Sequence, residues 1–224
     1  MWCVPQLDQE YLRRMEAVLA VLNRPLDKSA PVVALDKRPV QLVDSLRPAT
    51  AMAPGQPARR DYEYARCGTA NVFCVVVEPK TGRHQTHATA NRTATQFARA
   101  LKRIARRYPA ARTIHLVLDN LNTHRETSLT AAFGVQAGHR LWKIQGALLK
   151  HGSWLNPAEL EASLWSRQCL GRQRVASLAE LRKRTSAWNR WANRTQLKID
   201  WRFSSADARR VFHYQRIATH ESKH

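Results

Sequence analysis

Apolar and polar residues follow two kinds of pattern along this chain. Short, largely apolar runs lie at residues 32–35, 69–77 and 113–118, and turn-forming or charged residues bound them. Such runs are typical of buried strands. Residues 84–89 follow a turn of sequence EPKTG, and they are expected to return antiparallel to the preceding strand as a hairpin.

Apolar residues recur at helical spacing elsewhere, which predicts helices at residues 6–22, 93–108, 156–170 and 178–191. The third of these begins at Asn156, a favoured N-cap residue, and Pro157 takes the first helical position, where its missing N–H costs nothing. A short helix over 125–133, capped by Thr123 or His124, and a strand over 141–144 complete the predicted elements.

The order of these elements predicts an α/β fold. Three strands that can pair antiparallel are followed by alternating helix and strand, which suits a mixed sheet covered by helices. This order matches a ribonuclease H-like mixed five-stranded sheet with helices on both faces. We divide the chain into an N-terminal helix and linker (1–30), a catalytic domain (31–200) and a basic C-terminal tail (201–224).

Composition excludes a membrane protein and a disulfide-stabilised one. The chain has 224 residues, of which 44% are hydrophobic, but no apolar run approaches the roughly 18 residues of a membrane span. Its first residues lack the basic and then apolar segments of a signal peptide. The four cysteines form no CxxC pair, so we expect reduced thiols. We predict a cytoplasmic, nucleoid-associated protein.

Charge indicates a polyanionic partner. The chain has 37 Lys and Arg against 17 Asp and Glu, a net charge of +20, and each phosphate neutralised by a basic side chain releases condensed counterions. We predict DNA as the partner; RNA bound by aromatic stacking is a weaker alternative, because most aromatic residues fall at helix-core or motif positions. The predicted DNA-binding residues are Arg59, Arg60, Lys102, Arg103, Arg106, Arg107, Lys150 and Arg167.

Three acidic residues have the placement expected of catalytic metal ligands. Asp36 and Asp119 each end an apolar run, and Glu159 lies in the first turns of the helix that begins at Asn156. Two-metal phosphoryl transfer needs carboxylates gathered from separate elements, and Mg²⁺ or Mn²⁺ prefers oxygen ligands. Asp44 is an alternative to Asp36 as the first of the three metal ligands. Glu161 competes with Glu159, but two positions along a helix point about 200° apart, so both cannot face one site.

Longer motifs identify a family. The segments LDKRPVQLV, VLDNLNTH and HGSWLNPAE, which contain the three acids, resemble the DDE transposases of bacterial insertion sequences in the mariner-like superfamily. The resemblance implies that Asp36, Asp119 and Glu159 bind two Mg²⁺ or Mn²⁺ ions for DNA strand cleavage and strand transfer at element ends. It also implies supporting roles for Asn120, His124, Ser153, Trp154 and Asn156, and a homodimer when two ends are paired with target DNA.

The sequence departs from this family in three respects. Lys37 stands where relatives carry Glu, and a cation beside the metal ions would weaken their binding. The segment before the Ser-Trp-Leu-Asn motif lacks the expected aromatic, threonine and proline pattern. The chain also starts almost at the catalytic domain, without the family's helix-turn-helix region. An alternative function is therefore a catalytically silent DNA-binding remnant that pairs with or inhibits an intact transposase.

Overall fold

The computed structural model describes residues 8–59, 61–77, 81–118, 125–149 and 155–214. Its described strands form one mixed sheet in the order β3-β2-β1-β5-β6, with β4 also paired to β2. Strands β1 and β2 are antiparallel, whereas β1–β5 and β5–β6 are parallel. The six strands thus occupy five positions, because β3 and β4 share the outer edge of β2. Their bounds are β1 (Val32–Ser45), β2 (Tyr64–Val77), β3 (Arg83–His84), β4 (His87–Thr89), β5 (Ile114–Leu118) and β6 (Gln145–Leu149).

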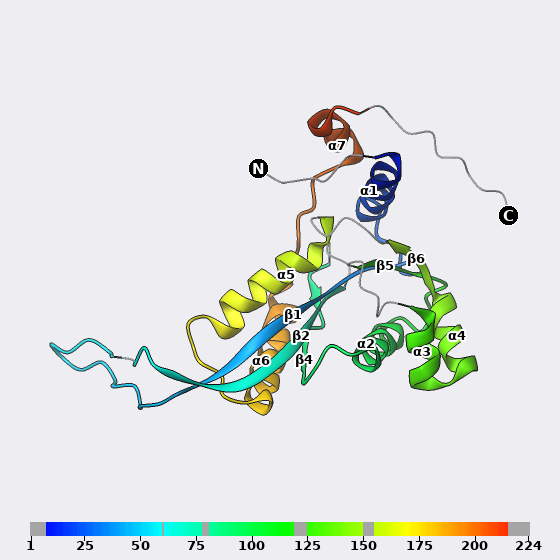
Figure 1. The fold of residues 1–224 in the computed structure, drawn as a ribbon. Helices are drawn as coiled ribbons and strands as arrows, with labels where there is room; N and C mark the ends of the chain where they lie inside the picture. Colours follow the sequence, from blue (N-terminus) through cyan, green and yellow to red (C-terminus); the bar gives the residue numbers. More distant parts are fainter. Residues whose placement is uncertain (1–7, 60, 78–80, 119–124, 150–154, 215–224) are drawn as a thin grey trace, which may run out of the picture.

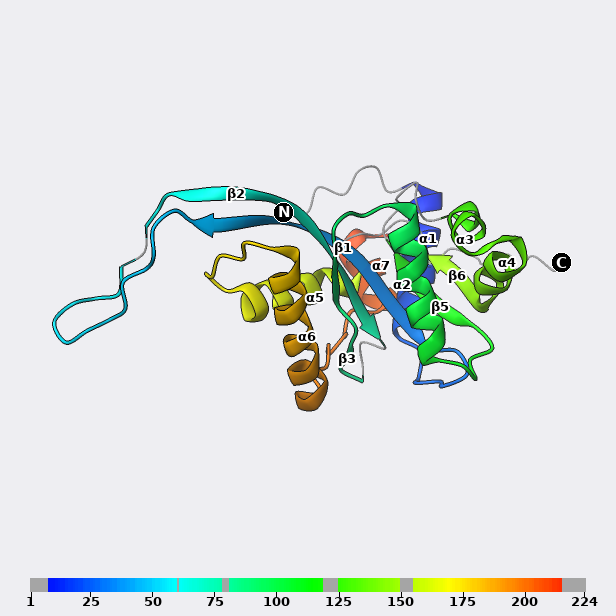
Figure 2. The same cartoon turned by 90° about the horizontal axis from the view of Figure 1, so that it is seen from below.

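Strands β1 and β2 are much longer than the apolar runs that predict them. Strand β1 continues nine residues past Asp36, to Ser45, because its backbone keeps pairing with β2 as far as Tyr64. The prediction that Asp36 ends its strand is therefore wrong: Asp36 directly follows the part of β1 that also pairs with β5, which ends at Leu35. Figure 2 shows the hairpin of β1 and β2 leaving the body as a long arm, with the loop predicted at 47–60 at its tip.

Helices cover both faces of the sheet, as predicted. On one face, Phe97 and Leu101 of α2 and Leu129 of α3 pack with Leu35 and Phe73 of the sheet. Figure 1 shows α2, α3 and α4 on this side and α1, α5 and α7 on the other. The helices are α1 (Gln9–Leu22), α2 (Ala94–Arg107), α3 (Glu126–Phe133), α4 (Val135–Ile144), α5 (Pro157–Trp165), the π-helical turn η2 (Ser166–Leu170), α6 (Leu178–Thr195) and α7 (Ser205–Phe212).

The opposite face buries two further clusters. Trp165 of α5 and Trp188 of α6 pack on Val40 and Val72 of the sheet. Met15 and Leu19 of α1 pack near Ala34 and Val117, together with Leu155 and the α7 residue Ala208. Alternate residues of β1 therefore serve different cores, which explains why its first residues form a continuous apolar run.

Two predicted boundaries in the middle of the chain are wrong. Residues 141–144, predicted as a strand, form the end of α4, where Leu141 packs against the α2 side of the sheet; the strand β6 follows at Gln145. Helix α3 has Arg125 as its N-cap residue. The predicted caps Thr123 and His124 lie outside the described residues.

The predicted C-terminal tail contains an additional helix. Ser204 and Asp207 form a capping box at the start of α7, which supplies reciprocal bonds to the free N–H groups of the first turn. The buried Ala208 packs into the α1 cluster, and Arg209 Nε lies 2.9 Å from Glu16 Oε1. A short helix with few apolar residues gives a weak periodic signal, so its tertiary contacts could not be predicted from the pattern.

Two findings bear on the compositional predictions. No helix among the described ranges is long and apolar enough to cross a lipid bilayer. Three cysteines fall in the described part of the chain, namely Cys67, Cys74 and Cys169, and all three are free thiols, as predicted.

His87 of β4 should make the protein sensitive to acid. Its ring stacks on Phe73 at a centroid distance of 5.2 Å, and burial, followed by the charge of Arg103, lowers its pKa from 6.5 to about 4. The fold therefore favours the neutral ring. The resulting stabilisation is fully present above pH 6.5 and is lost as the pH falls toward 4.

We therefore expect His87→Phe to flatten the acid side of the stability profile. Between pH 7.5 and pH 4.5, the free energy of unfolding of the native protein should fall by roughly 2 kcal/mol more than that of the variant. Urea unfolding at the two pH values measures this difference, and phenylalanine keeps the stacking on Phe73. Parallel profiles for the two proteins would contradict the assignment.

Candidate active site

The segments that precede the three predicted acids meet at Leu35. This buried residue of β1 comes directly before Asp36. Leu118, the last residue of β5 and the one before Asp119, pairs with Leu35 in the parallel register. Asn156, which begins the helix carrying Glu159, donates from Nδ2 to the Leu35 carbonyl oxygen at 3.1 Å. Three separate parts of the chain are thus joined by hydrogen bonding around one backbone position.

Asp36 is a half-buried carboxylate. The backbone N–H of Lys37 donates to Asp36 Oδ1 at 2.7 Å. Burial raises the pKa of Asp36, while that hydrogen bond and then the charge of Lys37 act in the opposite direction. Opposite Asp36 on β2 lies Cys74, and burial, followed by the charges of Glu161 and Asp36, raises the pKa of its thiol.

Lys37 projects to the other face of the sheet. Its Nζ lies over the ring of Phe97 in α2, 5.9 Å from the ring centroid, because successive side chains of a strand alternate between faces. Lys37 and Asp36 thus lie on opposite faces of the sheet, whereas the predicted effect of Lys37 on metal binding stays a prediction, because Asp119 lies outside the described residues. Its charge is the weakest of the influences on Asp36.

Helix α5 begins as predicted. The buried Asn156 side chain accepts from the N–H of Ala158 at 3.1 Å, and Pro157 follows as the first helical residue. The same amide therefore caps the helix through its oxygen and holds Leu35 through its nitrogen. Glu159 lies in the first turn and is exposed.

Glu161, the rival of Glu159, is fully engaged in a buried network. Its Oε2 lies 2.8 Å from Nδ1 of His84, and its Oε1 accepts from Thr86 Oγ1 at 3.0 Å. His84 Nε2 lies 2.9 Å from the Leu197 carbonyl oxygen. One proton is thus held between His84 and Glu161, and both carboxylate oxygens have partners. Glu161 therefore joins α5 to the β3 and β4 edge and is buried.

Sequence reasoning missed this network. His84 and Thr86 belong to the predicted hairpin, where nearly every residue from 84 to 89 is polar, and such a segment is typical of a solvent-exposed strand. Asn193 and Asn189 of α6 hold the backbone of His84 and Thr86, respectively, by paired hydrogen bonds. The only sequence signal was the presence of amide side chains on a helix that is otherwise basic.

The structure describes only part of the predicted site. Asp119, Asn120, His124, Ser153 and Trp154 lie outside the described residues. Within the described ranges, no group of three or more His, Cys, Asp or Glu side chains is arranged to hold a metal ion. Asp36 and Glu159 are the two predicted ligands that the structure describes.

The predicted DNA-binding residues are spread over the molecule. Arg59 is exposed on the arm, where its backbone pairs with Thr50, and Arg167 is exposed in η2. Lys102 lies over the Phe133 ring, 4.4 Å from its centroid. Arg103, Arg106 and Arg107 are exposed on α2, whereas Arg60 and Lys150 lie outside the described residues. No single basic surface combines the described members of the set.

Known structures share this fold. The Mos1 mariner paired-end complex with Mn aligns with a TM-score of 0.50 at 16% identity, covering 88% of this chain and 61% of that chain. The Mos1 strand transfer complex aligns with a TM-score of 0.51 at 16% identity, and the alignment covers 88% of this chain and 60% of that chain. The catalytic domain of Mos1 mariner transposase aligns with a TM-score of 0.50 at 12% identity, and the alignment covers 87% of this chain and 91% of that chain. This chain therefore spans about three fifths of the first two proteins.

Sequence comparison identifies the family. No curated protein matches the chain, but residues 31–182 match the family described as DDE superfamily endonuclease. That range includes all six described strands and α5, and it contains Asp36, Asp119 and Glu159. Since the match covers well over half of the sequence, this chain belongs to the DDE superfamily of endonucleases.

Proposed function

We propose that this chain is the catalytic domain of a transposase that cleaves DNA at the ends of a mobile element and joins the released 3′ ends to target DNA. The observation that carries this proposal is the convergence at Leu35, which ties together the segments of β1, β5 and α5 that precede the three family acids in the sequence. Solved Mos1 structures include a paired-end complex with transposon-end DNA and a strand transfer complex. In this proposal residues 31–200 form the catalytic domain.

The donor set fits two Mg²⁺ or Mn²⁺ ions. Asp36 is a half-buried carboxylate whose pKa is raised by burial, and only one described N–H donates to it. A cation would compensate such a charge, and carboxylate oxygen is the ligand that hard divalent ions prefer. We propose Asp36, Asp119 and Glu159 as the ligands. When bound, the ions would supply charge stabilisation for phosphoryl transfer and an activated water.

The chain's own residues would contribute chiefly by positioning. Asn156 fixes the start of α5 against Leu35, which places Glu159 three residues further along the helix. A water molecule would first attack the phosphodiester at the element's end, and the freed 3′-hydroxyl would then attack target DNA in line. Catalysis of such steps depends mainly on orientation and charge stabilisation. We infer supporting roles for Asn120, His124, Ser153 and Trp154.

A cleavage assay tests the proposal. Purified protein should nick a duplex that carries the ends of its element in the presence of Mn²⁺, and EDTA should stop the reaction. A paired-end intermediate should contain two copies of the chain. DNA binding without nicking, even when an intact relative supplies end binding, would favour the silent-remnant alternative.

Asn156→Ala should weaken both the fold and the chemistry. Loss of the cap costs about 1 kcal/mol, and loss of the amide donor leaves the Leu35 carbonyl without this hydrogen bond. We expect the free energy of unfolding to fall by roughly 2 kcal/mol and the nicking rate to fall by at least tenfold.

Ser177→Ala is the matched control for this prediction. Ser177 caps α6 by accepting from the Glu180 N–H, and the cap lies away from Leu35. Loss of this cap should lower the free energy of unfolding by about 1 kcal/mol as well. Nicking by the folded protein should be unchanged. Equal effects of the two variants on the nicking rate would contradict the positioning role of Asn156.

A further inference from the structure

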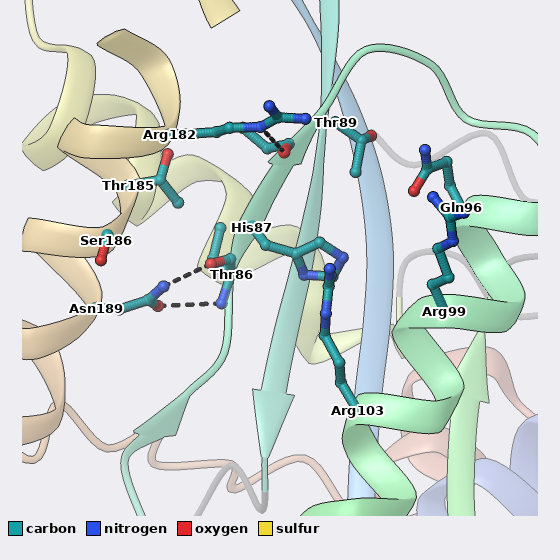
Figure 3. Close-up of a pocket in the computed structure, with 11 residues that line it drawn as sticks. Thr86, His87, Thr89, Gln96, Arg99, Arg103, Arg182, Thr185, Ser186 and Asn189 are labelled. Atoms are coloured by element: carbon teal, nitrogen blue, oxygen red, sulfur yellow. Dashed lines mark hydrogen bonds between the residues drawn. The ribbon is translucent and has the colours of Figure 1, made fainter. Parts of the chain in front are cut away.

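A basic pocket of about 400 Å³ opens between α2 and α6 beside β4. Figure 3 shows Arg99 and Arg103 reaching into it from α2 and Arg182 from α6, with His87 and Thr86 along its floor. None of the described residues that line it is Asp or Glu. Strand β4 is two strands from β1 in the sheet, so the pocket is separate from the Asp36 site.

The three guanidinium groups line one pocket and have no counter-charge among the described residues that line it. Partial burial, followed by the charges of Arg99 and Arg182, lowers the pKa of Arg103. Within the described part of the chain, neither Arg99 nor Arg103 forms an ion pair with a carboxylate. Like charges brought this close repel one another, and a bound anion would offset that repulsion.

The pocket wall is rigid before any ligand binds. Asn189 of α6 accepts from the Thr86 N–H at 3.0 Å and donates back to the Thr86 carbonyl oxygen, which fixes α6 to β4. Arg182 Nε donates to the Ala88 carbonyl oxygen at 3.3 Å, which orients its guanidinium group. Nε2 of His87 is buried and has no hydrogen-bond partner among the described residues. Polar groups therefore face a cavity that the chain itself does not fill.

We propose that this pocket binds one phosphate group of a DNA backbone. Guanidinium groups bind phosphate through paired, charge-assisted hydrogen bonds, and three of them around hydroxyl and amide groups match a phosphodiester better than a carboxylate or an apolar ligand. The pocket would anchor the DNA strand about 10 Å to the side of β1, because neighbouring β-strands lie about 4.8 Å apart. This inference rests on the proposed function for its choice of DNA over free phosphate.

The test compares two triple variants that remove equal charge. One carries Arg99→Gln, Arg103→Gln and Arg182→Gln in the pocket. Its control carries Lys183→Gln, Arg190→Gln and Arg194→Gln, which are exposed on α6 outside the pocket lining. Binding of a fluorescein-labelled duplex is measured by anisotropy at several salt concentrations. No divalent cation is present, and all proteins carry Asp36→Asn, so cleavage cannot affect the result.

We expect the pocket variant to bind DNA roughly tenfold more weakly than the control at 0.1 M salt. The slope of log affinity against log salt should fall by about one, the value for a single lost phosphate contact. Equal affinities and slopes for the two variants would overturn the proposal. Failure of the proposed function would instead be seen as absence of nicking by the native protein with this binding difference intact.

A second measurement distinguishes DNA from free phosphate. Inorganic phosphate should raise the melting temperature of the protein only at concentrations well above those at which the duplex does. If millimolar phosphate stabilises the native protein but not the pocket variant, while both bind DNA equally, the pocket is a free-anion site and the DNA assignment is wrong.

Removal of mutually repelling charges should leave the melting temperature of the pocket variant equal to or above that of the control.

Discussion

Asp36→Asn is expected to reduce metal-dependent DNA nicking by about a thousandfold and to leave the fold intact. Removal of one carboxylate from a two-metal site removes several kcal/mol of charge stabilisation, and each 1.36 kcal/mol is about tenfold in rate. Asparagine keeps the shape and still accepts from the Lys37 N–H. Because burial raises the pKa of Asp36, loss of its charge should not destabilise the protein.

Asp44→Asn is the control for this experiment. Asp44 lies on the same strand, is exposed, and likewise accepts from the N–H of the next residue, Ser45, at 2.7 Å. Its variant should nick DNA at the native rate. Nicking should be followed on supercoiled plasmid with Mn²⁺, and folding by circular dichroism. An active Asp36→Asn protein, or an inactive Asp44→Asn protein, would place the chemistry elsewhere on β1.

Much of the fold could be predicted because the pattern reflects burial directly. Residues 69–77 and 113–118 are continuous apolar runs since helices cover both faces of the sheet at β2 and β5. Asn156 and Pro157 marked the start of α5 correctly because capping is local chemistry. The mixed sheet and its two helical layers followed from these elements and their order.

The errors arise where tertiary contacts decide the structure. The outer half of β1 is a strand because it pairs with β2, although its sequence is largely polar. Residues 141–144 are as apolar as a strand, yet Leu141 packs from a helix onto the α2 side of the sheet. Helix α7 gains its stability from α1 through Ala208 and Arg209. Such long-range partners leave no local pattern.

The candidate site was only partly predictable for a related reason. The sequence singles out Asp36 and Glu159, but the side of the sheet on which Lys37 lies depends on the strand continuing through it. Once β1 is seen to extend past Asp36, alternation separates the two side chains. The faces on which Asp36 and Lys37 lie are therefore set by the pairing of β1 with β2, which is a long-range contact.

Glu159 and Glu161 should show opposite phenotypes when each is replaced by alanine. The exposed Glu159 contributes little to packing, so Glu159→Ala should change the free energy of unfolding by less than about 1 kcal/mol while abolishing nicking. Glu161→Ala leaves His84 and Thr86 buried without their carboxylate partner. Breaking one side of such a buried pair costs about 3–5 kcal/mol, so the protein should unfold at much lower urea concentration.

Glu161→Gln separates the role of this network from that of a metal ligand. The amide oxygen can still accept from Thr86 Oγ1, and the amide N–H can donate to Nδ1 of a neutral His84 ring whose Nε2–H faces Leu197. Most of the lost stability should therefore return, and nicking should be close to native. Glu159→Gln has no such rescue, because an amide cannot replace a carboxylate ligand. If Glu161→Gln folds normally but fails to nick DNA, the acid that α5 supplies to the site is Glu161, and the assignment of Glu159 is wrong.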